Sequence, residues 1–365
     1  MGRVRCKLRS KLRPRFRRKA RIISRAMSAP TSPDFPISDH CDGRLFFNPG
    51  VDTDRSLADL WRWRRSGRRV PWPARVPAAP APPPPREAGP GEVLLTLVGQ
   101  STVLIQVEGC NMLTDPIWSE RASPVSFAGP RRVRPPGIAF DDLPRIDLVL
   151  LSHNHYDHLD VATLKRLHAR SAPRIVTGLG NGRVLARHGL GRAVELDWWQ
   201  CCTPARGVDV TYLPAQHWSS RTGRDRRRAL WGGHAVQAGG ACVYFAGDSG
   251  YGPHFAAIGR AFAPDLALLP IGAYEPRWFM QAQHMDPFDA VQAHRDLAAG
   301  LSLGIHWGTF QLTDEAIDAP LEALARAKAE AGLDAGAFLA PDFGTTLVWR
   351  SRPLPAEAQG AGGSS

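Results

Sequence analysis

The feature that most constrains this chain is a cluster of three histidines and one aspartate within six residues, directly after the largely apolar run 146–151. The run predicts a short buried strand. Alternate side chains of an extended segment point the same way, so His153 and His155 can hold one cation. Asp157 and His158 follow where the chain turns, and they can face a second cation. Imidazole and carboxylate donors suit cations such as zinc, so the cluster predicts a metal site rather than a histidine-rich surface loop.

Three further metal-capable side chains each follow another predicted strand. His217 comes 59 residues after His158, Asp248 another 31 residues on, and His306 another 58. The carboxyl ends of buried strands gather at one edge of a sheet, where sites are commonly built. Taken singly, the two histidines could be core residues, and Asp248 could be a turn residue before Ser249. Together with the first cluster they predict a single site.

The rest of the sequence predicts alternating strands and helices. The expected strands are 93–98, 102–107, 111–113, 146–151, 174–177, 208–213, 241–246, 266–270, 301–306 and 345–349, and the expected helices are 161–170, 287–297 and 319–331. The first strands follow each other in hairpin order, and the later ones alternate with helices. This order favours an α/β (α+β) fold of mixed sheets covered by helices.

The positive charge of the chain is concentrated at one end. The formal net charge is +12, but residues 1–26 hold 12 of the 46 Lys and Arg and no acidic residue. The remaining 34 basic residues equal the 34 acidic ones, which argues against a nucleic-acid-binding body. The leader has three interpretations: a basic arm for anionic lipid or nucleic acid, a targeting peptide, or an over-long gene model that should begin at Met27.

Composition also suggests domain limits. We expect an N-terminal extension over 27–91 that ends in the Pro-rich linker 77–85, a catalytic domain over 92–352 and a disordered tail over 353–365. No apolar run approaches the ~20 residues of a membrane span. The six cysteines form no C-x-x-C pair, so reduced thiols and a cytoplasmic location are expected, with a position at the membrane periphery as the alternative.

Several motifs carry a resemblance to a known family. The H-x-H-x-D-H pattern of the metallo-β-lactamase superfamily stands at His153, His155, Asp157 and His158. Seven stretches resemble the N-acylphosphatidylethanolamine-hydrolysing phospholipase D family, and they are 113–117, 152–160, 216–218, 230–232, 245–248, 270–280 and 305–310. The match runs in order over about residues 92–320, and 270–280 is its most specific part.

The resemblance implies an αββα metallo-β-lactamase sandwich with two Zn²⁺ per chain between its two mixed sheets. By position, the implied ligands are His153, His155 and His217 for the first zinc, Asp157, His158 and His306 for the second, and Asp248 as the bridge between both. A water or hydroxide would lie between the ions. Two cations about 3.5–4 Å apart lower the pKa of a shared water and neutralise charge that grows on a phosphoryl oxygen.

Other residues are candidates for catalysis and substrate contact. Asp157 and Asp248 are candidate catalytic residues as well as ligands, and His284 is expected to contact the substrate phosphate or assist proton transfer to the leaving oxygen. A contact behind a zinc ligand is the alternative for His284. Tyr156 and Gln283 are further candidates for substrate binding.

Departures from the family pattern concern substrate fit. Gln100 stands where relatives usually have histidine, and Ser126 and Phe127 replace a polar Gln-Tyr pair of the mammalian enzymes. None of these three positions is an implied ligand. Asp115, before Pro116, is expected either to orient a ligand histidine or to be a turn residue.

The sequence is compatible with three functions. The first is a zinc phosphodiesterase that cleaves N-acylphosphatidylethanolamine-like phospholipids at a membrane surface, releasing N-acylethanolamine and phosphatidic acid. The second keeps the dinuclear site but acts on a soluble phosphodiester or a sugar-phosphate lactone. The third, a binding protein with a degenerate site, is disfavoured because all seven ligand candidates are present. For the oligomeric state, a homodimer is one possibility.

Overall fold

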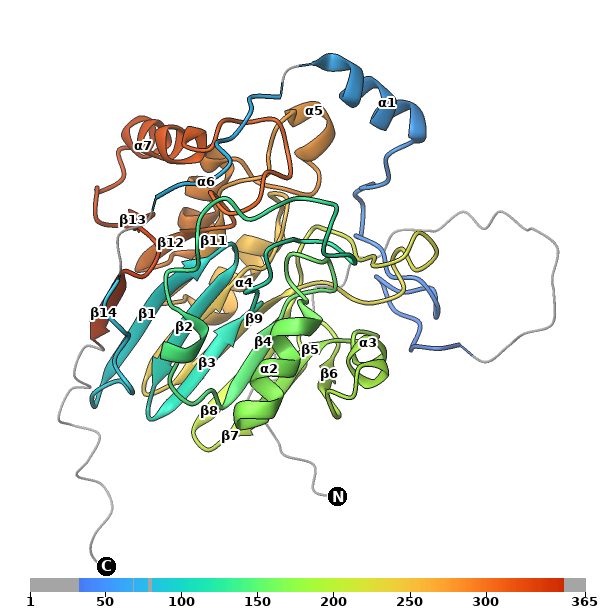
Figure 1. Cartoon of the computed structure of the whole chain (residues 1–365). Helices are drawn as coiled ribbons and strands as arrows, with labels where there is room; N and C mark the ends of the chain where they lie inside the picture. The colour runs from blue at the N-terminus through green and yellow to red at the C-terminus, as the bar shows by residue number, and fades with distance from the viewer. Residues whose placement is uncertain (1–32, 68, 78–80, 351–365) are drawn as a thin grey trace, which may run out of the picture.

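The computed structural model describes residues 33–350, apart from residue 68 and residues 78–80. The leader 1–26 and the tail 353–365, for which we made predictions above, lie outside the described residues. Figure 1 shows two layers of strands lying against each other, with helices on their outer sides. Within the described part of the chain, no helix is long and apolar enough to cross a bilayer.

The first sheet has seven strands in the order β14-β1-β2-β3-β4-β5-β6. They are β1 (Glu92–Gly99), β2 (Thr102–Val107), β3 (Cys110–Thr114), β4 (Leu148–Leu151), β5 (Arg174–Gly178), β6 (Val194–Leu196) and β14 (Thr346–Arg350). The pairs from β14 to β3 are antiparallel, and those from β3 to β6 are parallel.

The second sheet repeats this plan in the order β13-β12-β11-β10-β9-β8-β7. Its strands are β7 (Cys201–Ala205), β8 (Val208–Leu213), β9 (Gly233–Ala238), β10 (Ala241–Phe245), β11 (Leu266–Pro270), β12 (Leu301–Ile305) and β13 (Phe338–Leu339). The pairs from β7 to β10 are antiparallel, and those from β10 to β13 are parallel. Two sheets of matching plan agree with the predicted sandwich of mixed sheets.

The helices surround this sandwich, most of them on its outer faces and two of them, the first and the fifth, beyond one end of it (Figure 1). They are α1 (Leu57–Ser66), α2 (Val161–Ser171), α3 (Gly182–Arg187), α4 (His254–Phe262), α5 (Arg277–Met280), α6 (Pro287–Leu297) and α7 (Ala319–Ala331), with a 3-10 turn, η1 (Phe140–Asp142). Helix α2 buries Leu164 and Leu167 in a cluster with Val149 and Leu151 of β4. Its N-cap, Asp160, accepts a hydrogen bond from the backbone of Ala162, which fixes where the helix begins.

Strand β4 shows why the sandwich forms. Leu148 and Leu150 belong to the core cluster between the sheets, whereas Val149 and Leu151 belong to the cluster under α2. Successive side chains of a strand point to opposite faces, so a run that is apolar at every position must be covered on both sides. The strand is therefore held rigidly, and its carboxyl end is a fixed point for the residues that follow it.

The strands and helices expected from the sequence are confirmed within one or two residues at their ends. Four helices, α1, α3, α4 and α5, and four strands, β6, β7, β9 and β13, were not predicted. The N-terminal segment also contributes to the core, because Phe35, Cys41 and Phe46 pack in the cluster between the sheets. Residues 81–85 of the Pro-rich run have no helix or strand, as expected.

Candidate metal centre

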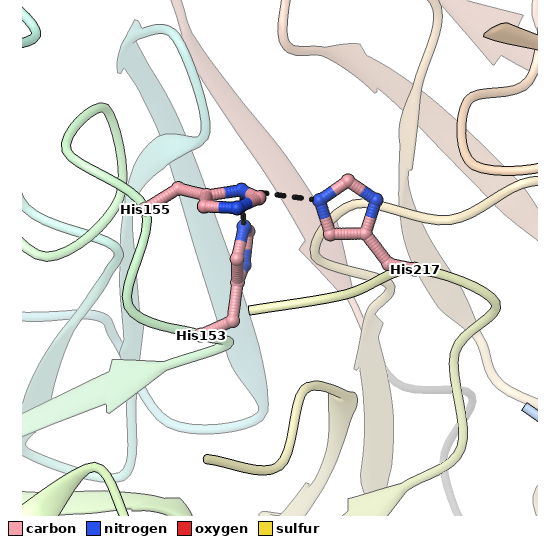
Figure 2. Close-up of side chains that lie close together, drawn as sticks. All are labelled: His153, His155 and His217. Carbon is pink, nitrogen blue, oxygen red and sulfur yellow. Dashed lines mark hydrogen bonds between the residues drawn. The ribbon is translucent and has the colours of Figure 1, made fainter. Parts of the chain in front are cut away.

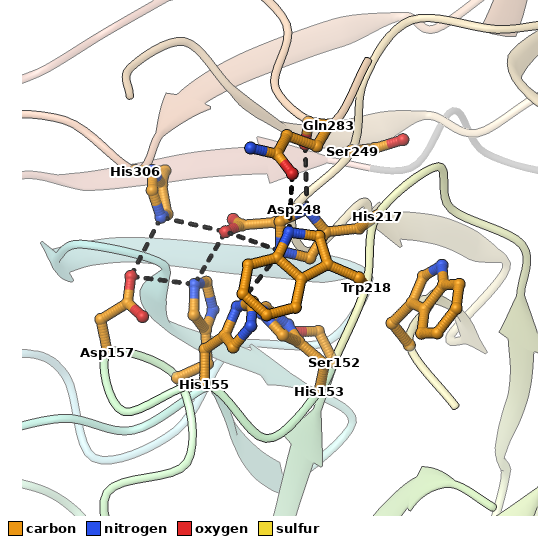
Figure 3. Close-up of polar contacts among 12 residues, drawn as sticks. Ser152, His153, His155, Asp157, His217, Trp218, Asp248, Ser249, Gln283 and His306 are labelled. Carbon is orange, nitrogen blue, oxygen red and sulfur yellow. Dashed lines mark hydrogen bonds and ion pairs between the residues drawn. The ribbon is translucent and has the colours of Figure 1, made fainter. Parts of the chain in front are cut away.

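Seven candidate ligands from distant parts of the sequence meet at one end of the sandwich. We call them the donor cluster, and they are His153, His155, Asp157, His158, His217, Asp248 and His306. Each lies in a loop that follows β4, β8, β10 or β12. Their ligand atoms form two compact groups, one of three histidines and one of two histidines and two aspartates. Figure 3 shows members of both groups pointing toward a common centre.

The first group consists of His153, His155 and His217 (Figure 2). His153 Nε2 lies 2.8 Å from His155 Nδ1, and His217 Nε2 lies 3.2 Å from the same atom. His153 and His217 are buried, and His155 is partly exposed. Three ring nitrogens that face each other at this spacing form a ready-made set of soft-to-borderline ligands.

The second group consists of Asp157, His158, Asp248 and His306. His158 Nε2 lies 3.0 Å from Asp248 Oδ2 and 3.2 Å from Asp157 Oδ2. His306 Nε2 lies 3.2 Å from the same oxygen of each aspartate. Asp248 Oδ2 is also 3.9 Å from His217 Nε2 in the first group. Asp248 therefore lies between the two groups.

The donor cluster fits divalent cations. Atoms bound about 2.0–2.2 Å from a zinc ion lie about 3–3.5 Å from one another. The shortest distances in the two groups, 2.8–3.2 Å, are at or slightly below this spacing. Two buried atoms of the second group, His158 Nε2 and Asp248 Oδ1, have no hydrogen-bond partner. For His158 this holds although two carboxylates lie close by. Buried polar atoms normally have a partner, and a bound ion would provide one here. The mixture of imidazole and carboxylate suits zinc and its neighbours rather than calcium or magnesium.

Asp115 supports the donor cluster from behind. Its Oδ2 lies 2.7 Å from His158 Nδ1, and its Oδ1 accepts a hydrogen bond of 2.7 Å from the backbone of Ser152. The Ser152 hydroxyl donates to Asp115 and lies 2.8 Å from His153 Nδ1, so one buried carboxylate contacts the second group directly and the first group through Ser152. Of the two interpretations made from the sequence, the structure agrees with an orienting role. Such partners fix the tautomer and the orientation of a ligand histidine.

Two more contacts position the first group. His217 Nδ1 lies 3.0 Å from the carbonyl oxygen of Gln283. The Trp218 ring packs edge-on against His155 at 4.4 Å, and its Nε1 donates to Gln283 Oε1 at 2.6 Å. The remaining ring nitrogen of His155 has no hydrogen-bond partner. On the side away from the other two histidines, packing against Trp218 rather than a hydrogen bond thus holds the His155 ring.

The two groups differ in their affinity for protons. Burial lowers the pKa of His153, brings that of His155 to about 4 and brings that of His217 to about 3. Burial also opposes the protonation of His158 and His306, but nearby carboxylates outweigh it. These carboxylates, Asp157 and Asp248 foremost, raise the pKa of His158 well above its usual range and that of His306 to about 9. A cation must therefore displace protons from the second group.

A cavity of about 470 Å³ opens onto the donor cluster. Its lining includes His155, Asp157, His217 and Asp248, as well as all three residues proposed for substrate contact, Tyr156, Gln283 and His284. Burial lowers the pKa of His284 to about 3, so its imidazole is neutral at ordinary pH. Ligand atoms of His284, His217 and Asp248 also lie close enough together to hold one ion. The catalytic and substrate-contact roles of these residues remain predictions.

One wall of this cavity was missed in the sequence. Helix α1 supplies Leu57, Leu60 and Trp63, which we call the α1 wall. A local signal was present, because the Ser56 side chain and Asp59 form a capping box at the start of the helix.

Two of the departures from the family pattern lie differently from what we expected. Gln100 is buried behind the donor cluster, where its Nε2 donates to Asp157 Oδ2 at 2.9 Å, and it does not line the cavity. Its effect is therefore on a candidate ligand rather than on substrate fit. Phe127 is 80% exposed and also lies outside the lining.

Comparisons with known proteins agree with this geometry. The model of the β-lactamase superfamily domain matches residues 110–307. Over 229 residues the chain is 41% identical to N-acyl-phosphatidylethanolamine-hydrolyzing phospholipase D 1 of Caenorhabditis elegans, which covers 60% of this chain and 64% of that enzyme. It is 32% identical over 236 residues to the mitochondrial N-acyl-phosphatidylethanolamine-hydrolyzing phospholipase D of Saccharomyces cerevisiae. This match covers 63% of this chain and 50% of the yeast enzyme. The chain thus spans less than two thirds of each of these relatives.

Solved structures show the same fold. The metallo-hydrolase Igni18 of Ignicoccus hospitalis covers 72% of this chain and all of its own, with a TM-score of 0.54 and 23% identity. The isothiocyanate hydrolase from Delia radicum gut bacteria covers 71% of this chain and all of its own, with a TM-score of 0.56 and 20% identity. At this identity the likeness concerns the fold alone.

Proposed function

Because the chain belongs to the β-lactamase superfamily and is a metallo-hydrolase of that fold, we propose that it is a zinc-dependent phosphodiesterase of the phospholipase D type. Its proposed substrates are N-acylphosphatidylethanolamine and related phospholipids, and its products are N-acylethanolamine and phosphatidic acid. The observation that carries the proposal is the division of seven donors into two groups joined by Asp248, at the base of an open cavity. Two relatives that are named for this reaction support the substrate class.

We assign two zinc ions to the donor cluster. His153, His155 and His217 would hold the first, Asp157, His158 and His306 the second, and Asp248 both. When bound, such a pair supplies hydroxide from water near neutral pH and stabilises charge that develops on phosphoryl oxygens. The protein must hold the phosphodiester against this pair and manage the proton of the leaving oxygen.

The residues of the cavity suit these tasks. His284 Nδ1 is buried without a hydrogen-bond partner, so it is available to a phosphoryl or leaving-group oxygen. Gln283 Oε1 accepts a hydrogen bond from Trp218 Nε1. Gln283 Nε2 donates to the sulfur of Met280 at 3.3 Å, which is a weak acceptor, so this amide can turn to a better one. The Tyr156 hydroxyl donates to the carbonyl of Arg221, which fixes its ring beside the donor cluster. In this proposal His284 and Gln283 contact the phosphate, and Tyr156 shapes the site.

The outer face near the cavity suits a lipid surface. Leu57 and Trp61 of α1 are 80% and 66% exposed, and Trp278 of α5 is 37% exposed. Arg64 and Arg65 end the same helix, and exposed aromatic and basic side chains favour the interface of an anionic bilayer. We therefore propose a peripheral position on the membrane, from which a phospholipid head group enters the cavity.

The decisive experiment measures hydrolysis of N-acylphosphatidylethanolamine in mixed micelles by mass spectrometry, with metal content determined in parallel. Wild type should bind two zinc ions and release N-acylethanolamine and phosphatidic acid. Asp248→Asn keeps the shape of the side chain but weakens the binding of both proposed ions, so turnover should be lost. Light scattering on the protein without micelles would test for a homodimer.

Two bound metals without lipid turnover would contradict the substrate and keep the dinuclear hydrolase. Soluble phosphodiesters and sugar-phosphate lactones would then be the substrates to try. Absence of bound metal in wild type, together with absence of turnover, would contradict the hydrolase itself.

A further inference from the structure

The N-terminal extension contributes directly to the cavity above the donor cluster. Leu57, Leu60 and Trp63 line it together with Phe279, Met280 and Leu312 from the catalytic domain. Residues three apart are neighbours on a helix surface, so the three side chains of the α1 wall form one apolar strip. The cavity thus has a polar base with metal-capable residues and an apolar side.

The α1 wall is anchored at one end and exposed at the other. Trp63 Nε1 donates to Asp314 Oδ2 at 2.7 Å, and its ring packs on Phe279 at 4.9 Å. At the other end Leu57 is 80% exposed, and α1 has no buried residue. A helix that keeps leucines at the opening of a cavity, instead of in the core, leaves apolar surface for a ligand to cover.

The size of the cavity limits what can cover this surface. Its volume of about 470 Å³ is in the range of sites that hold one small molecule. N-acylphosphatidylethanolamine has three long chains, so at most one of them can enter beside the phosphodiester. Leaving a bilayer costs a lipid free energy in proportion to the apolar area withdrawn. The single chain on the amide side therefore enters more easily than the two chains of the glycerol side.

We propose that the α1 wall binds the N-acyl chain of the substrate, so that the N-terminal extension sets selectivity for the length of that chain. This inference rests on the proposed function, because it takes N-acylethanolamine as the leaving product. The glycerol side, with its two chains, stays in the lipid surface. The same strip should bind free N-acylethanolamine as a product.

Binding of N-acylethanolamines of increasing chain length to the zinc-loaded protein tests this inference by calorimetry, without any turnover. The chains are kept short enough to stay monomeric. In wild type the affinity should rise about threefold to fourfold per methylene until the chain fills the cavity. Leu60→Trp fills part of the cavity, so the rise should stop at a shorter chain and the longest ligand should bind about tenfold more weakly.

Ala58→Trp is the matched control, because it adds the same side chain to the same helix at a position outside the cavity lining. Its length profile should follow wild type. Thermal unfolding and zinc content show whether either variant has lost the fold. A wild-type affinity that does not depend on chain length, or an equal effect of both variants, would overturn the inference.

The proposed function can fail separately. Protein that binds the alkyl chain with the expected profile but does not cleave N-acylphosphatidylethanolamine would contradict the reaction and keep the α1 wall as an alkyl site. Cleavage of the lipid together with a flat profile in the calorimetric series would contradict only the role of α1.

Discussion

The donor cluster and the α1 wall face the same cavity but are held in opposite ways. Every residue of the donor cluster lies in a loop after a buried strand, and Asp115 ties its two groups together. The α1 wall comes from the N-terminal extension and has no buried residue, and its helix is attached through contacts such as those of Trp63 and the stacking of Arg62 on Trp278. In the two proposals above, the core of the fold therefore fixes the chemistry, and the α1 wall sets which molecule is accepted. Changes in the two regions should therefore have different consequences.

The largest effect is expected from His306→Ala in the donor cluster. The change removes one proposed ligand of the second zinc and leaves Asp157 and Asp248 with His158 in place of two imidazole partners. Zinc content should fall from two ions toward one. Activity should fall more than about 100-fold for every substrate, beyond the effect of losing an outer partner of a ligand. Measuring kcat/KM for one long-chain and one short-chain lipid provides the check, since an effect on only one of them would break the division between chemistry and selectivity.

Asp115→Asn should have the next largest effect, because it acts on the donor cluster without removing a ligand. Asn can still accept from the backbone of Ser152 but loses the charge beside His158. The affinity for zinc should fall about 10-fold to 100-fold. Competition with a chelator measures that affinity. Asp314→Asn is the control from the other region, because Asp314 anchors Trp63 and not a ligand, and its zinc affinity should stay at the wild-type value.

The structure brings together the residues of the donor cluster that the sequence singled out, whereas the α1 wall was missed, and the difference has a physical reason. Each member of the donor cluster follows a strand whose apolar run is visible locally, and strand ends meet at one edge of a sheet. The α1 wall depends on contacts between Trp63 and residues 216 and 251 positions away, Phe279 and Asp314. No periodic pattern encodes such a contact. The capping box at Ser56 did encode the helix itself, and it was overlooked.

The same reasoning explains the smaller misses. Strand β7 contains Pro204 and β9 begins with Gly233, and both residues weaken a strand signal although they are tolerated at edges and irregular positions. Asp115 could not be assigned from sequence, because an aspartate before a proline is typical of a turn. Its partner His158 is 43 residues away, and only the folded chain brings them together.

A pH-dependent effect is expected at the base of the N-terminal extension. His40 Nδ1 lies 2.7 Å from Asp39 and His40 Nε2 lies 2.7 Å from Asp197, with its ring stacked on Trp198. Burial opposes protonation, but the two carboxylates outweigh it and raise the pKa of His40 above its ordinary value of 6.5. The protonated ring thus stabilises the fold fully below pH 6.5, and this stability is lost as the pH rises through the folded-state pKa.

His40→Gln should accordingly lower the free energy of unfolding by about 1–2 kcal/mol at pH 6 and by less at pH 9. Urea unfolding at both pH values measures the difference. The exposed His188→Gln is the matched control and should show the same small change at both. An equal loss for His40→Gln at pH 6 and pH 9 would mean that packing on Trp198, rather than charge, holds this segment. The attachment of the N-terminal extension to the core would then depend on packing and not on charge.

The smallest effect is expected from Trp63→Phe, which keeps the ring on Phe279 and removes only the hydrogen bond to Asp314. Such a bond to a charged acceptor contributes about 1–2 kcal/mol where it is partly exposed. Because α1 has no buried residue, loss of this hydrogen bond should loosen the helix rather than unfold the protein. Hydrogen exchange of the α1 amides should accelerate about 5-fold to 30-fold, while exchange in β4 and the zinc content should not change. Equal acceleration in β4 would show that the α1 wall and the donor cluster form one cooperative unit, and the separation of selectivity from chemistry would have to be abandoned.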